Sequence, residues 1–377
     1  MDSSLKETST RRGRDVSVDI IKGIAIVLVI YAHTWPFCKN FIRFFNLPIF
    51  MVTSGYCFKN RIGSWADWRR YMAGKLRTLF LPCALCNGIF TLLTGVFLRL
   101  GLYTGDPAFL TMTADWPVPQ RLHTVQGIGD LLWKLVRVLL LTDTTQMGTG
   151  TWFLIMLFAA SAFHGAFCCL TARLTPRHRQ AAMTALFLLT AVLAQFSDPL
   201  FNGSSYAKCA LYFYLTYLFG LLLREPFVRR LETPLLSCLS FAVLLVLARY
   251  YYIDVATGSV AGVLPYLAGV LCGWLLLRPA AGYLARQDRL SRIFCYLGRH
   301  TISVICLHIL CFKPVTWLYI RACQLPKIYL ASFHVDFDVS EPWKLLYLAA
   351  GVILPLLLAA LWRCLRDRIR LLIGKAG

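Results

Sequence analysis

The chain has 377 residues, of which 58% are hydrophobic and only 15% are charged, and its mean hydropathy is +0.61. This composition excludes a water-soluble globular protein and indicates an integral membrane protein. The net charge of +21 would favour nucleic acid binding in a soluble protein, but the basic residues here follow the loops between apolar segments, and we expect no nucleic acid partner.

Apolar runs close to the ~20 residues that cross the hydrocarbon core of a membrane recur along the chain. We count about ten of them, so the sequence predicts an all-α, polytopic membrane domain over 18–364, preceded by a tail of residues 1–17 and followed by a basic tail at 365–377. The predicted spans are 18–36, 41–58, 76–100, 149–170, 181–196, 206–223, 234–252, 258–277, 293–320 and 344–362. No cleavable signal peptide is apparent before the first span.

The first span carries three ionisable side chains, Asp19, Lys22 and His33, in a segment that is otherwise lipid-soluble. At about 100° per residue, the eleven residues from Lys22 to His33 make about three turns, and Asp19 precedes Lys22 by one short turn. All three therefore share one helix face, with Lys22 and His33 roughly 16 Å apart along the axis. Ionisable groups at this depth usually line a protein interior or a water-filled cavity, so we predict a functional site.

Basic residues are concentrated in alternate loops. One set consists of both tails and the loops at 59–77, 173–179, 224–230 and 278–292. The intervening loops are acidic or mixed, so the positive-inside rule places the basic set and both termini in the cytoplasm.

The long loop at 101–148 is predicted to face outward, and a loop of this length is usually functional. Within it, residues 131–140 form an amphipathic piece that we expect to lie in the outer interface. Trp133 would anchor that piece, with its cations in water.

Further motifs follow the first span in a fixed order. They are Phe45-Asn46-Leu47-Pro48-Ile49-Phe50 with Ser54-Gly55-Tyr56, Lys75-Leu76-Arg77 ahead of Pro82, Thr151-Trp152-Phe153-Leu154, and Gly298-Arg299-His300-Thr301-Ile302 ending at His308. Together with the Asp-Ile-x-Lys-Gly-Ile pattern that leads to His33, they make the chain similar to acyltransferase family 3 of membrane O-acyltransferases, in particular to its fucose 4-O-acetylase-like branch. The resemblance covers about residues 18 to 310.

This resemblance implies transfer of an acyl group, usually acetyl, from cytosolic acetyl-CoA to a hydroxyl of a cell-surface glycan or its lipid-linked precursor, in the cell membrane. It also implies that Lys22 and His33 are essential. Many members have Arg where this chain has Lys22, and His is common where Asn46 stands, so we assign Asn46 no catalytic role. The partners are then acyl-CoA, the glycan acceptor and membrane lipids.

Acyl transfer from a thioester to a sugar hydroxyl needs a base, a group that stabilises the oxyanion and a grip on the CoA phosphates. We predict that His33 is the general base, because its unperturbed pKa near 6.5 suits proton exchange. Asp19 is predicted to pair with Lys22 or to orient it. The predicted phosphate-binding residues are Arg69, Arg70, Lys75 and Arg77, and the predicted substrate-binding residues are Ser54, Tyr56, Trp152, His300 and His308.

Alternatives remain open at this stage. His33 is also compatible with a packing role, and Lys22 with a side chain that reaches the cytosolic interface. Trp152 suits an interfacial anchor, and Arg69 and Arg70 suit topology determinants. The competing function is a secondary transporter or glycan flippase with Asp19, Lys22 and His33 as a proton relay, although no inverted repeat is evident. The cysteines lack metal-site spacing, so we expect neither a metal nor a permanently bound cofactor.

Overall fold

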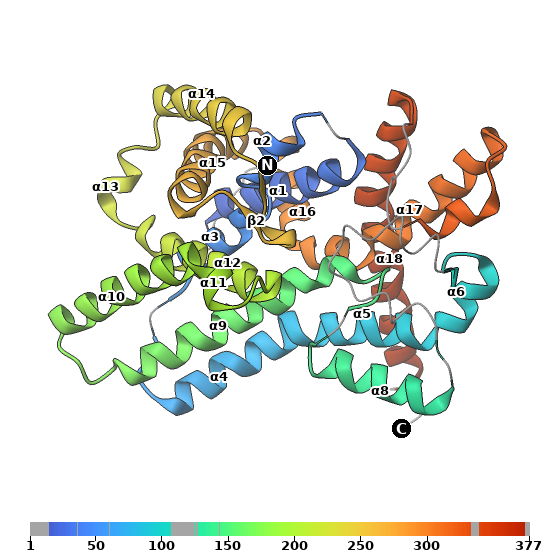
Figure 1. Cartoon of the computed structure of the whole chain (residues 1–377), viewed down its shortest axis with the longest axis horizontal. Coiled ribbons are helices and arrows are strands. Elements are labelled where there is room, and N and C mark those ends of the chain that lie inside the picture. The colour runs from blue at the N-terminus through green and yellow to red at the C-terminus, as the bar shows by residue number, and fades with distance from the viewer. Residues whose placement is uncertain are drawn as a thin grey trace, which may run out of the picture.

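The computed structural model describes residues 15–35, 37–59, 61–106, 125, 127–142, 144–332 and 339–373. Over these residues the chain is almost entirely helical (Figure 1), which confirms the predicted all-α class. The two short strands among them, β1 (Ile253–Asp254) and β2 (Ser259–Val260), form an antiparallel pair in which Ile253 faces Val260.

The helices follow one another along the chain. In the first half they are α1 (Val16–Thr34), α2 (Lys39–Arg43), α3 (Pro48–Tyr56), α4 (Trp65–Lys75), the π-helix η1 (Leu76–Phe80), α5 (Leu81–Leu92), α6 (Thr94–Leu100), α8 (Ile128–Leu139), the 3₁₀ turn η3 (Thr149–Thr151) and α9 (Trp152–Leu170). In the second half they are α10 (Pro176–Gln195), α11 (Ser197–Leu200), α12 (Ser205–Leu222), α13 (Pro226–Arg229), α14 (Pro234–Tyr250), η4 (Val255–Thr257), α15 (Val263–Leu284), α16 (Asp288–Arg299), α17 (Thr301–Ala322), η5 (Lys327–Ala331) and α18 (Glu341–Ile373).

Several helices begin at side chains that cap their free backbone N–H groups. Asp15 accepts a hydrogen bond from Ser17 N at the start of α1, and Ser64 accepts from Asp67 N at the start of α4. Thr175 and Thr233 play the same part ahead of α10 and α14, each followed by a proline in the first turn. These are the residue types that favour a helix start, so local sequence fixes these boundaries.

Five helical segments are long and apolar enough to cross a membrane among the residues described: Val16–Thr34, Thr149–Leu170, Val263–Leu284, Thr301–Ala322 and Glu341–Arg368. A sixth span is possible if Trp65–Leu92 and Thr94–Leu100, which meet at a bend of 56°, are taken together. The chain is therefore a membrane protein with several spanning helices. The number of ten spans and the cytoplasmic location of both termini remain predictions.

Four predicted segments take a different form. The span expected at 41–58 is divided into α2 and α3, and the nine residues of α3 reach about 14 Å, less than half of the ~30 Å hydrocarbon core. The basic loop expected at 59–77 is helical from Trp65 onward, and the span expected at 293–320 breaks at His300, between α16 and α17. The tail expected from 365 continues α18 to Ile373.

The amphipathic piece expected in the outward loop forms α8, while much of that loop lies outside the described residues. Trp133 is 60% exposed, as an interfacial anchor should be. Lys134, however, is buried and ion-paired with Asp130 at 2.7 Å, so the expectation that its ammonium lies in water was wrong.

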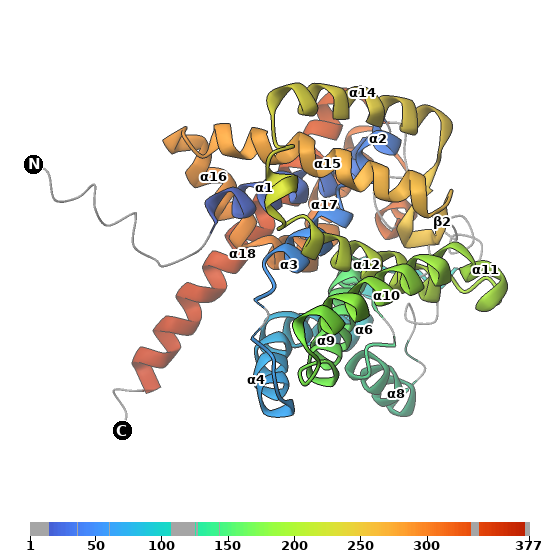
Figure 2. The same ribbon diagram turned by 90° about the vertical axis from the view of Figure 1, so that its left-hand side faces the viewer.

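Helix α1 lies at the centre of the fold and packs on α3, α15, α16 and α18 (Figures 1 and 2). Glycines permit the closest approaches. A side chain at Gly23 would meet the backbone of Phe294, and one at Gly298 would meet the backbone of Asp19, so α1 and α16 touch backbone to backbone. Small residues serve this purpose at membrane helix interfaces, and the contact fixes the N-terminal half of α1 against α16.

Candidate active site

Two pockets lie at the two ends of α1. One contains His33 and is called the histidine pocket, and the other contains Lys22 and is called the basic pocket. Lys22 and His33, which were predicted to share one helix face, therefore line separate cavities about three turns apart.

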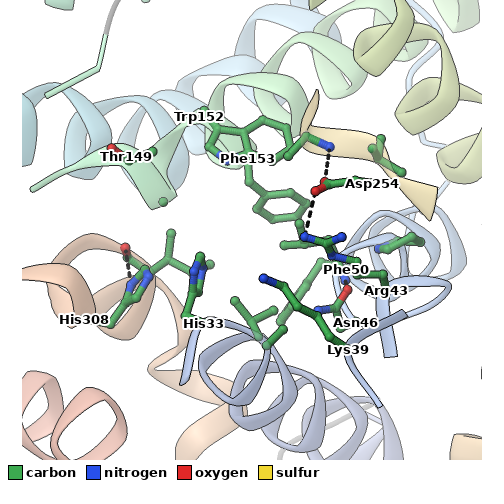
Figure 3. A pocket seen from close by; sticks show the side chains of 18 of the residues that line it. His33, Lys39, Arg43, Asn46, Phe50, Thr149, Trp152, Phe153, Asp254 and His308 are labelled. Carbon is green, nitrogen blue, oxygen red and sulfur yellow. Dashed lines mark hydrogen bonds and ion pairs between the residues drawn. The ribbon is translucent and has the colours of Figure 1, made fainter. Parts of the chain in front are cut away.

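The histidine pocket lies between α1, α2, α3, α9, α17, β1, the η3 turn and the η4 turn, and has a cavity volume of about 80 Å³. It is lined by Val29, Ala32, His33, Lys39, Arg43, Asn46, Leu47, Pro48, Phe50, Thr149, Gly150, Trp152, Phe153, Asp254, Val255, Ala256, Ile305, His308 and Ile309. Figure 3 shows His33 and His308 beside each other at one end and Arg43 with Asp254 at the other. The two imidazole centroids are 5.3 Å apart. Three predicted site residues, His33, Trp152 and His308, thus share one cavity.

His308 is held in a defined orientation. Its Nδ1 lies 2.9 Å from the carbonyl oxygen of Val304 and 3.0 Å from that of Ile305. Carbonyl oxygens only accept hydrogen bonds, so we assign the proton of a neutral ring to Nδ1, which makes Nε2 the basic nitrogen. Gly150 allows this packing, since a Cβ there would come within 2.7 Å of His308 Cε1.

The segment that carries Thr149, Gly150 and Trp152 is anchored by a buried amide. Asn87 of α5 is fully buried, and its Nδ2 donates to Thr151 Oγ1 at 2.7 Å. Its Oδ1 accepts from the backbone N of Thr145 at 2.7 Å. A buried amide with both ends bonded defines a single arrangement, so Asn87 sets where this wall of the pocket stands.

Charged groups that the sequence analysis did not predict lie opposite the histidines. Lys39 and Arg43 enter from α2, and Arg43 forms an ion pair of 2.8 Å with Asp254 from β1. Asn40 holds that region in place by donating to the carbonyl oxygens of Ala248 and Tyr251. Lys39 lies between the first two predicted spans and Arg43 lies within the second, and a cation at such a position was the available signal for them.

Asn46 also lines this pocket, although the sequence analysis assigned it no catalytic role. Its Oδ1 accepts from the backbone N of Leu47 at 2.7 Å. This local hydrogen bond lies directly ahead of α3, so Asn46 has a structural role in the pocket wall.

The basic pocket is wider, with a cavity volume of about 610 Å³. It is lined by Lys22, Thr53, Ser54, Cys57, Phe58, Lys59, Arg61, Ile62, Asp67, Arg70, Tyr71 and Lys75. The predicted residues Lys22, Ser54, Arg70 and Lys75 therefore meet in one place. Lys59 and Arg61 join them, and Asp67 is the one acidic residue among these lining side chains. Such a surface suits a polyanionic ligand.

The remaining predicted residues lie outside both pockets. Asp19 is buried and ion-paired with Arg299 at 3.3 Å. Tyr56 is buried against Trp274, with ring centroids 5.0 Å apart. His300 bonds to Arg363 at 3.0 Å, near the start of α17.

The arginines on either side of the basic pocket are also outside it. Arg69 and Arg77 are exposed, and neither lines the cavity. The helical form of α4 and η1 explains this result, because successive residues of a helix point in different directions.

The comparison with known families gives one match. The family model described as an acyltransferase domain matches residues 15–364, nearly the whole chain. The chain belongs to acyltransferase family 3. No curated protein and no solved structure matches it. As a member of this family the chain is an acyltransferase.

Proposed function

We propose that this acyltransferase moves an acetyl group from acetyl-CoA, bound in the basic pocket, to a hydroxyl of a cell-surface glycan or its lipid-linked precursor in the histidine pocket. The observation that carries the proposal is the pair of pockets on one rigid helix, one rich in cations and the other containing two histidines. CoA brings several phosphate charges, and the acceptor hydroxyl needs a base.

The two pockets approach each other along α1 and α3. Val29 and Phe50 line the histidine pocket, whereas Lys22 and Thr53 line the basic pocket, so the two helices run in opposite directions between them. The separation is seven residues on α1, about 10 Å, and three residues on α3, about 4.5 Å. A CoA thioester sits at the end of a long flexible arm. We propose that this arm enters between α1 and α3 and presents the thioester near His33.

His33 is the proposed general base, and His308 is its neighbour in the same pocket. Nδ1 of His308 is bonded to backbone carbonyls, and we propose that its Nε2 takes part in proton transfer or binds a substrate hydroxyl. A positioned imidazole contributes on the order of 10²-fold to 10⁴-fold in such reactions. Lys22 is proposed to contact the donor at the opposite end of the helix, because a cation there complements phosphate.

The phosphate grip is proposed to consist of Arg70 and Lys75 with Lys59 and Arg61, since these four cations line the basic pocket with Lys22. Acetyl as the acyl group, a glycan as the acceptor and the fucose 4-O-acetylase-like branch rest on the sequence resemblance. The cell membrane as the location rests on the same resemblance.

Purified protein in lipid nanodiscs, supplied with acetyl-CoA labelled in the acetyl group, tests this proposal. We expect release of free CoA that depends on an added glycan acceptor and appearance of the label as an alkali-labile ester. Solute transport across vesicles without consumption of acetyl-CoA would instead favour the transporter alternative. Use of succinyl-CoA in preference to acetyl-CoA would correct the donor while leaving the reaction class intact.

A further inference from the structure

A third cavity lies on the opposite side of α17 from the histidine pocket and is called the leucine groove. Its volume is about 860 Å³, and it is bounded by α6, α17, η5 and α18. It is lined by Arg99, Leu100, Leu102, Leu310, Cys311, Lys313, Pro314, Trp317, Lys327, Leu330, Leu354, Leu357, Leu358 and Leu361. A volume of this size is typical of a ligand site.

The long wall of the groove is apolar and outward-facing. Leu354, Leu357, Leu358 and Leu361 recur at helical spacing on α18, and Leu357 is 58% exposed. Trp317 of α17 is 51% exposed on the facing wall. In a membrane protein such a stripe contacts lipid chains, and the concave shape offers one chain more contact than a flat helix surface does.

One end of the groove is cationic. Arg99 lies in the last turn of α6, and Lys327 is the first residue of η5. The Cε atom of Lys327 lies 3.5 Å from the position that a Cβ at Gly101 would take, two residues after Arg99. Neither Arg99 nor Lys327 has an ion pair with another residue of the described chain. Both are exposed, so a ligand can reach them.

A third cation supports this end of the groove. Lys313 is buried and donates to the carbonyl oxygens of Leu330 and Ser332, which ties η5 to α17. The described residues that line the groove include three cations and no Asp or Glu. A site with an apolar wall and two exposed cations, Arg99 and Lys327, at one end complements a ligand with a hydrocarbon chain and a negatively charged head.

We propose that the leucine groove binds an anionic membrane phospholipid, with an acyl chain along the α18 leucines and the phosphate at Arg99 and Lys327. Cations near a membrane surface attract anionic headgroups individually, and two convergent cations beside an apolar groove add selectivity to that attraction. The bound lipid would pack against the back of α17, the helix that carries His308 on its other side. This proposal does not depend on acyl transfer.

The test uses full-length protein, purified and stripped of lipid in a zwitterionic detergent. It is then titrated with phosphatidylglycerol or phosphatidylcholine of identical acyl chains, and bound lipid is counted by native mass spectrometry. We expect phosphatidylglycerol to bind about tenfold more tightly, as two favourable headgroup contacts imply. Equal affinity for the two lipids would overturn the proposal.

Three variants locate the binding. Arg99→Gln with Lys327→Gln should abolish the preference for phosphatidylglycerol, whereas Arg249→Gln with Arg289→Gln, exposed cations outside the groove, should retain it. Leu358→Trp, which narrows the groove, should weaken binding of both lipids.

Retained preference in the groove double variant would contradict the assignment, provided that it elutes as a monodisperse protein. Extraction of a glycan diphosphate lipid instead of a phospholipid from the wild-type protein would overturn the phospholipid and identify an acceptor-lipid site.

Discussion

The two pockets at the ends of α1 differ in size and charge, as a ligand-binding surface differs from a reaction site. The basic pocket is about 610 Å³ and is lined by Lys22, Lys59, Arg61, Arg70 and Lys75. The histidine pocket is about 80 Å³, and its charged residues include the closed pair of Arg43 with Asp254. A wide cationic surface attracts a charged ligand over a distance, and its cations share the binding. A narrow pocket with two imidazoles acts only through direct contact, so single substitutions there have larger effects.

The largest expected effect is at His33. His33→Ala should lower kcat by at least 10²-fold, the usual contribution of a general base. Binding of a non-hydrolysable acetyl-CoA analogue should stay unchanged, because the basic pocket lies at the other end of α1. His178→Ala, at an exposed histidine at the start of α10, is the matched control. Normal turnover by a well-expressed His33→Ala protein would remove His33 from the mechanism.

The next largest effect is expected at Lys22, which lines the basic pocket together with Thr53 and Ser54 of α3. Lys22→Met should lower kcat/KM by about 30-fold, as loss of a charge-assisted contact of about 2 kcal/mol implies. Lys22→Arg should retain most of the activity because the charge stays. Equal activity of the Met and Arg variants, measured in the same membranes, would show that the side chain merely reaches the interface.

Four basic residues that are close in sequence should differ in their effect on donor binding, because Arg70 and Lys75 line the basic pocket and Arg69 and Arg77 do not. Arg70→Gln with Lys75→Gln should raise the acetyl-CoA KM by about tenfold with a smaller change in kcat, because these contacts bind ground state and transition state alike. Arg69→Gln with Arg77→Gln, outside the cavity, should change it less than twofold. The difference should shrink at high salt. Equal effects of both pairs would move the donor away from the basic pocket.

The smallest expected effect is at Asn87, which acts on the histidine pocket through the segment it anchors. Asn87→Leu should lower kcat about fivefold and leave donor-analogue binding intact, because its lost bonds to Thr145 and Thr151 loosen the wall beside His308. Stability should fall by about 1–3 kcal/mol. Ser237→Ala removes a bond to Leu275 O between α14 and α15 and should lower stability without changing kcat. Matching kcat values for the two variants would make Asn87 a purely structural residue.

Local sequence was sufficient for much of the fold. The apolar periodicity of α1, α9, α15, α17 and α18 reports burial or lipid contact directly, and these segments coincide with predicted spans. It failed over 41–58, where Pro48 starts a new helix instead of continuing one. An apolar run has the same composition whether it crosses a membrane or is buried inside a bundle, so composition could not distinguish α3 from a span.

The two pocket residues of α1 were predicted because their residue type is costly in an apolar segment. His33 and Lys22 stand out because ionisable groups at membrane depth need a partner or a cavity. Asn87 and Asp254 carry no such signal, since an amide within a helix and an acid in a short strand are unremarkable alone. Asp254 becomes part of the histidine pocket only because Arg43 meets it, 211 residues away in the chain.

The sequence by itself determined the membrane class, the helical fold, the family motifs and the two ionisable positions of α1, because hydropathy and helical spacing are local properties. The tertiary structure decided that Lys22 and His33 face different cavities, that His308 and Trp152 join His33, and that Asp19 pairs with Arg299. It also brought Arg70 and Lys75, but not Arg69 and Arg77, to the basic pocket. These outcomes depend on how helices far apart in the chain pack together, and close contacts such as Gly23 on Phe294 set that packing in three dimensions.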